Sequence, residues 1–410
     1  MRILWVKVGG LWPLDSGGRL RSFHILRELA RRHSVTVLTT HGPGDEPQGL
    51  AAQVPEARVV SVPHAPPKQG SARFAAALVR SWLSPQPLEL LKWRVPELRR
   101  AVRQLLARGA YDVCVADFLA SVPNVGLGGP VPVVLFEHNV EHAIWKRLHA
   151  VERRIWRRWP LALEWRKVRR SEARACAAAG LTLAVSENDR DSLSTLAAGA
   201  RVEAIPTGVD VEFFRARPGA ERDGHLVFTG SMDWYPNEDG VLHFLEHTWP
   251  HIRAAVPHAH FTVVGRNPGP RLRQAAAAAG GVTVTGRVED VRPFVEAAAV
   301  YVAPLRVGGG TRLKLFEALA MGKAVVATPL AAEGLPITPG RHYVAAGEPA
   351  DFARAVLELL ADRQRAARLG DAGRRLVEWR FSWPSVVDEV EQRLVHVVRE
   401  TKPEPARPVA

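Results

Sequence analysis

The sequence predicts an α/β protein made of two successive doubly wound, Rossmann-like domains. Short apolar segments alternate with helical segments along most of the 410 residues. The same alternation starts again near residue 226, where a second apolar strand leads into a second glycine loop. Strands that are apolar throughout are typical of a parallel sheet that helices cover on both faces. The length suits two domains of ordinary size.

The first domain is expected at residues 1–205. It begins with the apolar strand 2–8, a glycine-rich loop and a helix at 19–32 whose apolar residues share one face. Further strands are expected at 34–39, 59–62, 112–116, 131–137, 181–185 and 202–205. Ligands of such sheets bind at the carboxyl ends of the strands. Polar residues that directly follow a strand are therefore candidate site residues.

The second domain is expected at residues 206–380. A helix is expected at 239–255. The predicted strands are 226–229, 260–264, 282–285, 300–304, 324–327 and 343–344. A further helix is predicted at 381–400, and the proline-rich tail 401–410 is expected to be disordered.

Composition limits the classes of protein that the chain can belong to. The sequence is 47% hydrophobic and 24% charged, as in globular proteins. No apolar run approaches the roughly 18 residues that a membrane span needs. The opening MRILWVKVGG is too short and too soon interrupted for a secretory signal. Cys114 and Cys176 lie in apolar elements, which favours a reducing compartment. We therefore expect a cytoplasmic protein.

The net charge of +13 is concentrated in two segments. Residues 71–108 have a net charge of +6 and residues 146–174 of +8, so the rest of the chain is close to neutral. Tryptophans alternate with the arginines in both segments, a pattern that suits an anionic membrane surface. The alternative is that the apolar faces belong to the core and the arginines are solvated. We expect peripheral docking at the inner face of the plasma membrane.

The run PLRVGGGTRLKLFEALAMGKAVVATP, at 304–329, predicts a phosphate site. Glycines let backbone N–H groups approach a ligand closely, and the N-terminus of the following helix attracts anions. Residues expected to bind a diphosphate are Gly309, Gly310, Thr311, Arg312 and Lys314. Glu317 lies one turn further along and is placed to accept hydrogen bonds from ribose hydroxyls. An ordinary glycine turn before a charged helix is the alternative.

This run resembles the nucleotide-sugar site of the retaining glycosyltransferases of family 4. The segment IPTGVDVEFF, at 205–214, is similar to the interdomain signature of the same family. The family usually has Glu-x7-Glu here, and Glu317 matches the second glutamate, while Gly309 stands at the first. The family also has an Arg and a Lys where this chain has Ser231 and Asn237. We expect Arg312 and Lys314 to supply that charge.

The resemblance implies a GT-B fold, with the two domains facing a cleft and the helix at 381–400 crossing back to the first domain. It also implies transfer with retention and without a metal or other cofactor, the nucleotide-diphosphate sugar being a co-substrate. His138 is expected to contact the donor sugar near its reacting carbon, as the catalytic residue. The other expected positions are Gly17 and Gly18 at the donor diphosphate, Arg287 and Val288 at the base, and Arg19, Arg21 and Asp117 on the acceptor side.

The function that the sequence predicts is transfer of a sugar from a nucleotide-diphosphate sugar to a cell-surface glycan or a lipid-linked acceptor. Three alternatives stay open. The chain is a GT-B nucleotide-sugar epimerase, an inactive nucleotide-sugar-binding protein, or a nucleic-acid-binding protein favoured by the pI of about 10.4. No nucleic-acid-binding motif accompanies the basic segments, so nucleic acid is not an expected partner.

Overall fold

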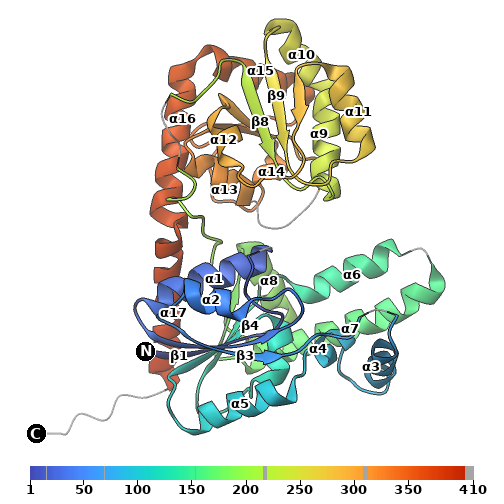
Figure 1. Cartoon of the computed structure of the whole chain (residues 1–410), viewed down its shortest axis with the longest axis vertical. Coiled ribbons are helices and arrows are strands. Elements are labelled where there is room, and N and C mark those ends of the chain that lie inside the picture. Colours follow the sequence, from blue (N-terminus) through green and yellow to red (C-terminus); the bar gives the residue numbers. More distant parts are fainter. Residues whose placement is uncertain (15, 69, 153, 216–218, 308–312, 402–410) are drawn as a thin grey trace, which may run out of the picture. The chain divides into compact units, whose positions relative to one another are not determined.

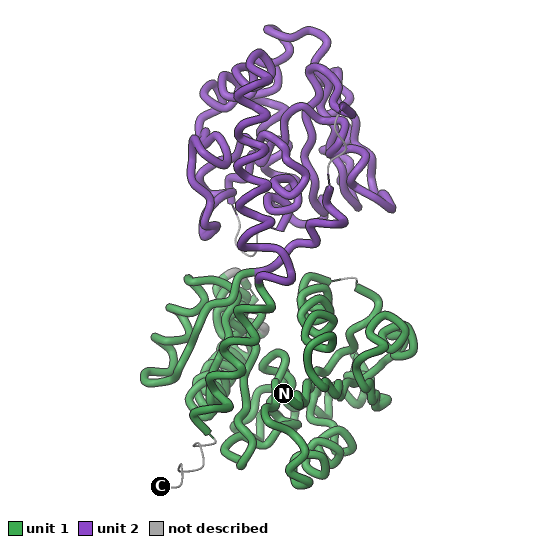
Figure 2. Tube along the Cα trace, turned by 90° about the vertical axis from the view of Figure 1, so that its left-hand side faces the viewer, with its two compact units in different colours: residues 1–206, 386–410 green, residues 207–385 purple. Residues whose placement is uncertain are grey.

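The computed structural model describes residues 1–14, 16–68, 70–152, 154–215, 219–307 and 313–401. The chain divides into two compact units (Figure 2). Unit 1 comprises Met1–Pro206 and Val386–Ala410, and unit 2 comprises Thr207–Ser385. The sequence prediction placed the first boundary one residue earlier and the second about five residues earlier.

Unit 1 contains a parallel seven-stranded sheet in the order β3-β2-β1-β4-β5-β6-β7 (Figure 1). Its strands are β1 (Arg2–Lys7), β2 (Ser34–His41), β3 (Arg58–Pro63), β4 (Val113–Asp117), β5 (Val133–Phe136), β6 (Leu181–Ala184) and β7 (Val202–Ala204). Strands β1, β4 and β5 are almost entirely buried, because helices cover both faces of the sheet. The strand order reverses between β1 and β4, which is where ligands of doubly wound sheets bind.

The longest helix of unit 1 among the described residues is α7 (Ile155–Ala178), with 24 residues. The other helices of residues 1–206 are α1 (Gly17–Ala30), α2 (Pro47–Gln53), α3 (Ala72–Trp82), α4 (Leu88–Lys92), α5 (Pro96–Ala107), η1 (Leu119–Asn124), α6 (Glu141–Val151) and α8 (Glu187–Leu196). Helices α6 and α7 pack against each other as a hairpin that projects from the sheet (Figure 1). Most of the basic segment 146–174 lies in this hairpin.

The C-terminal helix α17 (Trp383–Thr401) belongs to unit 1 from Val386 onward. Arg32, just beyond α1, donates hydrogen bonds to Asp388 and Glu391 of α17. The buried apolar face of α17 includes Val390 and Leu394. The expected return of the C-terminal helix to the first domain is confirmed.

Unit 2 contains a parallel six-stranded sheet in the order β10-β9-β8-β11-β12-β13. Its strands are β8 (His225–Thr229), β9 (His260–Val264), β10 (Val282–Val284), β11 (Val300–Ala303), β12 (Ala324–Ala327) and β13 (Val344–Ala345). The helices are α9 (Tyr235–His247), α10 (Trp249–Ala255), α11 (Pro270–Ala279), α12 (Arg292–Glu296), α13 (Leu313–Ala320), α14 (Pro329–Ala332), α15 (Pro349–Ala361), α16 (Arg363–Leu376) and η2 (Val377–Phe381). The two Rossmann-like sheets that the sequence predicts are therefore present.

One predicted helix is wrong in its extent. The single helix expected at 239–255 is two helices, α9 and α10, which meet at Thr248. Pro250, two residues further along, has no N–H for the hydrogen bond that a continuous helix would need there.

Within the described part of the chain, no helix has the length and apolar character to cross a membrane.

Candidate active site

Asp117 is the centre of a buried polar cluster at the carboxyl end of β4. Its Oδ1 lies 2.7 Å from His138 Nε2, and its Oδ2 accepts a hydrogen bond of 2.9 Å from Trp5 Nε1. The ammonium of Lys7, at the end of β1, lies 3.5 Å from the same Oδ2. Three strands, β1, β4 and β5, thus bring polar side chains together where the strand order reverses.

The environment keeps Asp117 ionised and His138 neutral. Burial favours the neutral acid, but Lys7 and His138 outweigh it and lower the pKa of Asp117 to about 2. Burial lowers the pKa of His138 to about 4, although Asp117 opposes this shift. An ionised carboxylate only accepts hydrogen bonds, so His138 Nε2 carries the proton and Nδ1 is left as an acceptor. The ring of His138 stacks on Phe118 at 3.9 Å between centroids.

Phe118 has a strained backbone, with φ of 72°. A bulky residue rarely adopts this conformation, and such outliers gather at functional sites. A Cβ on Gly18 would lie 2.5 Å from the Phe118 ring, so only glycine leaves room for it there. Gly17 and Gly18 open helix α1, whose N-cap is Ser16. The expected diphosphate glycines therefore lie beside the Asp117 cluster.

Arg19 and Arg21, near the start of α1, differ in burial and in hydrogen bonding. Arg21 is buried, which lowers the pKa of its guanidinium to about 9 against the opposing charges of Asp189 and Asp117. Its Nη2 has no hydrogen-bond partner among the described residues. Arg19 instead bonds to Asp45 Oδ1 at 2.7 Å and to the carbonyl oxygen of Gly9 at 2.8 Å. Of the two, Arg21 has the donor that a bound anion would satisfy.

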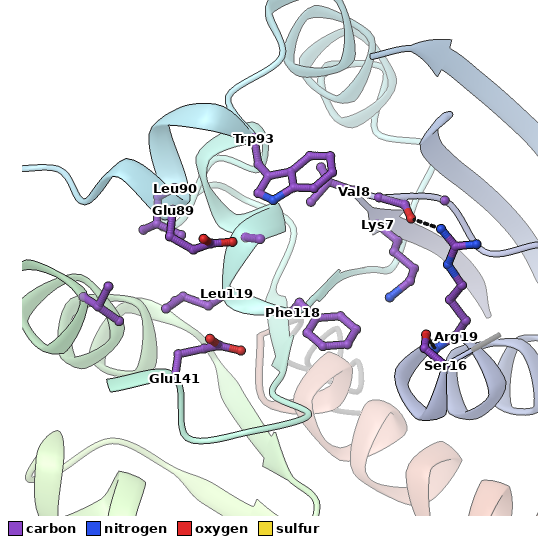
Figure 3. A pocket seen from close by; sticks show the side chains of 14 residues that line it. Lys7, Val8, Ser16, Arg19, Glu89, Leu90, Trp93, Phe118, Leu119 and Glu141 are labelled. Atoms are coloured by element: carbon purple, nitrogen blue, oxygen red, sulfur yellow. Dashed lines mark hydrogen bonds between the residues drawn. The ribbon is translucent and has the colours of Figure 1, made fainter. Parts of the chain in front are cut away.

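A pocket of about 290 Å³ lies next to this cluster (Figure 3). Its lining comes from the end of β1, the following loop, the start of α1, α4 and the residue after it, the segment after β4, the start of α6 and the middle of α7. The lining residues are Lys7, Val8, Gly9, Gly10, Ser16, Arg19, Glu89, Leu90, Trp93, Phe118, Leu119, Ala120, Glu141 and Val168. Arg19 is the predicted acceptor-side residue among them; Arg21 and Asp117 do not line it.

In unit 2, helix α13 carries Lys314 and Glu317 one turn apart. Burial raises the pKa of Glu317 to about 7, and among the described residues the charge of Lys314 opposes the shift. Lys314 Nζ donates a hydrogen bond to Asn237 Oδ1 and lies 4.6 Å from the centre of the Phe228 ring. Hydrogen bonds donated by a ligand would therefore stabilise the ionised form of Glu317.

Two sequence-family models match the chain, one in each half. Residues 17–213 match the profile described as "Glycosyltransferase Family 4", and residues 223–362 match "Glycosyl transferases group 1". The chain belongs to glycosyltransferase family 4. It has the GT-B fold of sucrose-phosphate synthase from Thermosynechococcus elongatus. That structure is 16% identical, with a TM-score of 0.67 over 97% of this chain and 100% of that one.

Two sequence relatives are mannosyltransferases. A phosphatidyl-myo-inositol mannosyltransferase from Mycolicibacterium smegmatis is 32% identical over 49% of this chain and 53% of its own length. A GDP-mannose-dependent monoacylated alpha-(1-6)-phosphatidylinositol monomannoside mannosyltransferase from Corynebacterium glutamicum is 28% identical over 44% of this chain and 52% of its own. The chain thus spans about half the length of these relatives.

Two of the positions at which the sequence departs from the expected pattern, Ser231 and Asn237, are linked to Lys314 through Asn237. Asn237 Nδ2 donates to the carbonyl oxygen of Ser231 at 2.8 Å, while Asn237 Oδ1 receives Lys314. A Cβ on Gly230 would lie 2.9 Å from Lys314 Nζ, so the ammonium lies close to this loop. That Lys314 supplies the charge expected at these positions stays a prediction.

Some expected contacts lie elsewhere or outside the description. Gly309, Gly310, Thr311 and Arg312 lie outside the described residues, so their roles stay predictions. The two expected base-pocket residues follow β10: Arg287 is exposed, and Val288 packs on the core of unit 2.

Sequence reasoning missed several residues of the site. Lys7, Glu89 and Trp93 line the pocket, and Arg266 donates a 2.7 Å hydrogen bond to Ser231 Oγ. For Lys7 the sequence offered a signal, since a lysine that ends an apolar strand is unusual.

Within the described ranges, no group of three His, Cys, Asp or Glu side chains is placed to hold a metal ion.

Proposed function

We propose that this protein is a retaining, metal-independent glycosyltransferase that uses a nucleotide-diphosphate sugar. Glu317 is the observation that carries the proposal. A carboxyl group whose pKa is raised by burial destabilises the ligand-free fold when it is ionised. Hydrogen bonds from the two ribose hydroxyls would offset that cost, and the ammonium of Lys314, one turn away, would meet the diphosphate.

In the proposed reaction the bond between the anomeric carbon and the diphosphate oxygen breaks, and that oxygen keeps the electron pair. The acceptor oxygen then bonds to the same face of the anomeric carbon, and its proton passes to the leaving diphosphate. No side-chain nucleophile is needed. His138 would contribute its neutral ring, with Nδ1 accepting a hydrogen bond from a donor-sugar hydroxyl while Asp117 fixes Nε2. The unsatisfied Nη2 of Arg21 supports an anionic group nearby.

The first experiment is a panel of UDP-, GDP- and ADP-sugars with EDTA present. Thermal shift reports binding, and release of nucleoside diphosphate reports turnover. We expect one nucleotide series to stabilise the protein and to give slow diphosphate release that an acceptor accelerates. Stabilisation with sugar interconversion and no release would favour the epimerase, and stabilisation without any chemistry would favour the inactive binder. The absence of any shift would contradict donor binding.

The relatives supply the donor and acceptor to try first. Both names specify transfer of mannose and a phosphatidylinositol-type lipid, and that of the Corynebacterium glutamicum relative specifies dependence on GDP-mannose. We propose the same donor and a lipid-linked acceptor for this chain. Activity with GDP-mannose and a water-soluble glycan, without activity on the lipid, would contradict the acceptor half of the proposal.

A surface on α3, α6 and α7 supports an acceptor at a membrane, and we call it the hairpin surface. Eight of the thirteen large hydrophobic side chains exposed among the described residues lie there: Val79, Trp82, Leu83, Ile144, Leu148, Ile155, Trp156 and Trp159. Exposed arginines accompany them, namely Arg73, Arg80, Arg147, Arg154 and Arg158. Lys167 of α7 donates to the carbonyl oxygen of Ser81, which joins α3 to the hairpin.

We propose that the hairpin surface docks on an anionic bilayer. Tryptophan suits the boundary between headgroups and acyl chains, and each arginine near an anionic surface adds about 1 kcal/mol of attraction. The expected placement is the inner face of the plasma membrane.

Vesicle flotation tests this docking. Wild-type protein should float with phosphatidylglycerol-containing vesicles at low salt, and less with neutral vesicles. The variant with Ile155, Trp156 and Trp159 changed to serine should lose most of its binding. The control is Trp379→Ser, because Trp379 is 76% exposed but lies in unit 2. Equal flotation of the triple variant and the wild type would overturn the proposal. So would a wild-type dimer that the same three substitutions dissociate, because the hairpin surface would then be an interface between two copies of the chain.

A further inference from the structure

The pocket of unit 1 lies where the strand order reverses. Lys7 ends β1 and Phe118 follows β4, the two strands on either side of the reversal. Its volume of about 290 Å³ is at the small end of the range for ligand pockets. A space of this size suits one six-membered ring with its hydroxyl groups.

Trp93 gives the pocket an aromatic wall, and Phe118 borders it by its edge, because His138 and Lys7 cover the faces of the Phe118 ring. Figure 3 shows Trp93 and Phe118 at the edge of the same hollow. Trp93 is fixed by a 2.8 Å hydrogen bond from Asn124 Nδ2 to its carbonyl oxygen. A Cβ on Gly9, which has φ of 84°, would lie 3.4 Å from the Trp93 ring, so the loop after β1 approaches the indole closely. Sugar and cyclitol rings present C–H faces that pack on such aromatic surfaces.

The cations that line the pocket are already paired within the protein. Lys7 lies 3.5 Å from Asp117, and Arg19 lies 2.7 Å from Asp45. An anionic ligand would therefore compete with carboxylates that are already in place, at a cost in desolvation.

The opposite wall of the pocket is acidic. Glu89 and Glu141 point into it (Figure 3). Glu89 is paired with Lys92 at 2.6 Å, and burial together with Glu172 and Glu89 raises the pKa of Glu141 to about 7. The carboxylate of Glu89 accepts hydrogen bonds from hydroxyl groups and repels a negative group, and Glu141 adds to the repulsion as it ionises, near pH 7.

We infer that this pocket binds an uncharged, polyhydroxylated six-membered ring of the acceptor, a hexopyranose or a cyclitol. The indole of Trp93 packs on its C–H face, the edge of Phe118 borders it, and Glu89 and Glu141 accept hydrogen bonds from its hydroxyl groups. The inference rests on the proposed transferase function and names the class of acceptor. It also assigns a specificity: a ring that carries a carboxylate on the side of Glu89 and Glu141 is rejected.

Saturation-transfer NMR on the full chain, without nucleotide, measures this binding directly. The probes are methyl α-D-mannopyranoside, myo-inositol and glucuronate. We expect at least one of the two neutral rings to bind, and glucuronate to bind at least tenfold more weakly. Trp93→Ala should weaken neutral-ring binding at least tenfold, whereas Trp93→Phe, which keeps an aromatic wall, should remain within about threefold of wild type. Trp379→Ala is the matched control for loss of an indole.

The role of Glu89 and Glu141 is tested by comparing the affinity for neutral rings with the affinity for glucuronate. The double variant Glu89→Gln and Glu141→Gln should narrow the preference for neutral rings over glucuronate, because the repelling charges are gone. Unchanged binding in Trp93→Ala, or equal binding of glucuronate and neutral rings by wild type, would overturn the inference. If neither neutral ring binds the wild type, the inference also fails.

A second readout separates this inference from the proposed function. Each variant is also tested for thermal stabilisation by nucleotide sugars, which should match wild type because none of these residues is expected to contact the donor. Donor binding without ring binding would refute the pocket assignment alone. Ring binding without donor binding would refute the transferase proposal alone.

Discussion

The two units differ in how they hold charge at the carboxyl ends of their sheets. In unit 1 the buried Asp117 is surrounded by Lys7, His138 and Trp5, so its charge is balanced by the fold itself. In unit 2 burial raises the pKa of Glu317, and among the described residues Lys314 is the one that opposes the shift. The comparison indicates that the fold itself balances the charge in unit 1, whereas in unit 2 the ionised form of Glu317 costs stability, as we expect of a carboxylate that a ligand would satisfy.

The largest effect is expected from removing the charge at the centre of unit 1. Asp117→Asn should destabilise unit 1 by about 3 kcal/mol, because it leaves the buried ammonium of Lys7 without its counter-charge. Amide hydrogen exchange of β1 and β4 peptides measures the loss, and unit 2 peptides should be unchanged. The control is Asp191→Asn, which breaks an exposed pair and should cost less than about 1 kcal/mol.

The same variant has a predicted pH dependence. The pKa of Asp117 is lowered in the folded state to about 2, so its stabilising contribution is present above pH 4 and is lost as the pH falls toward 2. The difference between wild type and Asp117→Asn should therefore shrink on acidification below pH 4. A difference that stays constant down to pH 2 would contradict the pairing.

The second effect is on nucleotide affinity in unit 2. Lys314→Ala should weaken binding of the preferred nucleotide sugar by roughly 10- to 100-fold, as expected for loss of a hydrogen bond to a charged group of about 1.5–3 kcal/mol. Titration calorimetry measures it, with Lys314→Arg expected to keep part of the affinity. Arg354→Ala, an exposed cation on α15, is the control. An unchanged affinity in Lys314→Ala would remove this residue from the donor site.

The third effect tests whether Glu317 is retained for function. Its pKa is raised to about 7 in the folded state, so the ionised form destabilises the protein progressively as the pH rises from about 4.5 through 7. Glu317→Gln should therefore gain stability relative to wild type by roughly 1–3 kcal/mol between pH 5 and pH 8.

Thermal denaturation of the ligand-free protein at both pH values checks this gain. The nucleotide-sugar-induced shift in Tm should fall in the same variant, because the amide replaces the acceptor of the ribose hydroxyls. A variant that is less stable at both pH values and keeps full nucleotide affinity would refute the functional role.

The smallest effect is expected from a neutral buried pair in unit 2. Thr229 Oγ1 lies 2.8 Å from the hydroxyl of Tyr301, and both are buried. Tyr301→Phe should cost about 1–2 kcal/mol, since the neutral hydrogen bonds of its hydroxyl to Oγ1 and the N–H of Thr229 are lost. Hydrogen exchange of β8 and β11 peptides measures it. A loss as large as that of Asp117→Asn would show that charge is not what distinguishes the two units.

Local sequence was sufficient for most of the fold. Each predicted strand of both sheets is present, because an uninterrupted apolar run such as Val300–Ala303 can be satisfied only inside a covered parallel sheet. The helix at 239–255 was wrong in extent because its apolar spacing continues past Pro250, and periodicity does not register a missing N–H.

The candidate site was predictable only in part. His138 and Asp117 were found because they follow strands, and Lys314 and Glu317 because they follow a glycine loop. Their neighbours were not: Lys7 meets Asp117 across 110 positions of the chain, and Trp93 comes from the segment that follows α4. Nor does the sequence indicate the positive φ of Phe118, which Gly18 accommodates from another element.

By itself, the sequence determined the two sheets, the strand ends that carry polar groups and the concentration of positive charge, since each follows from local period and composition. The tertiary structure alone decided which charges are paired, which pocket they surround and whether the tryptophans of residues 141–176 are core or surface. Trp159 is 75% exposed although its spacing fits a buried helical face. Periodicity shows that side chains share a face, but only the packing of distant segments decides what that face meets.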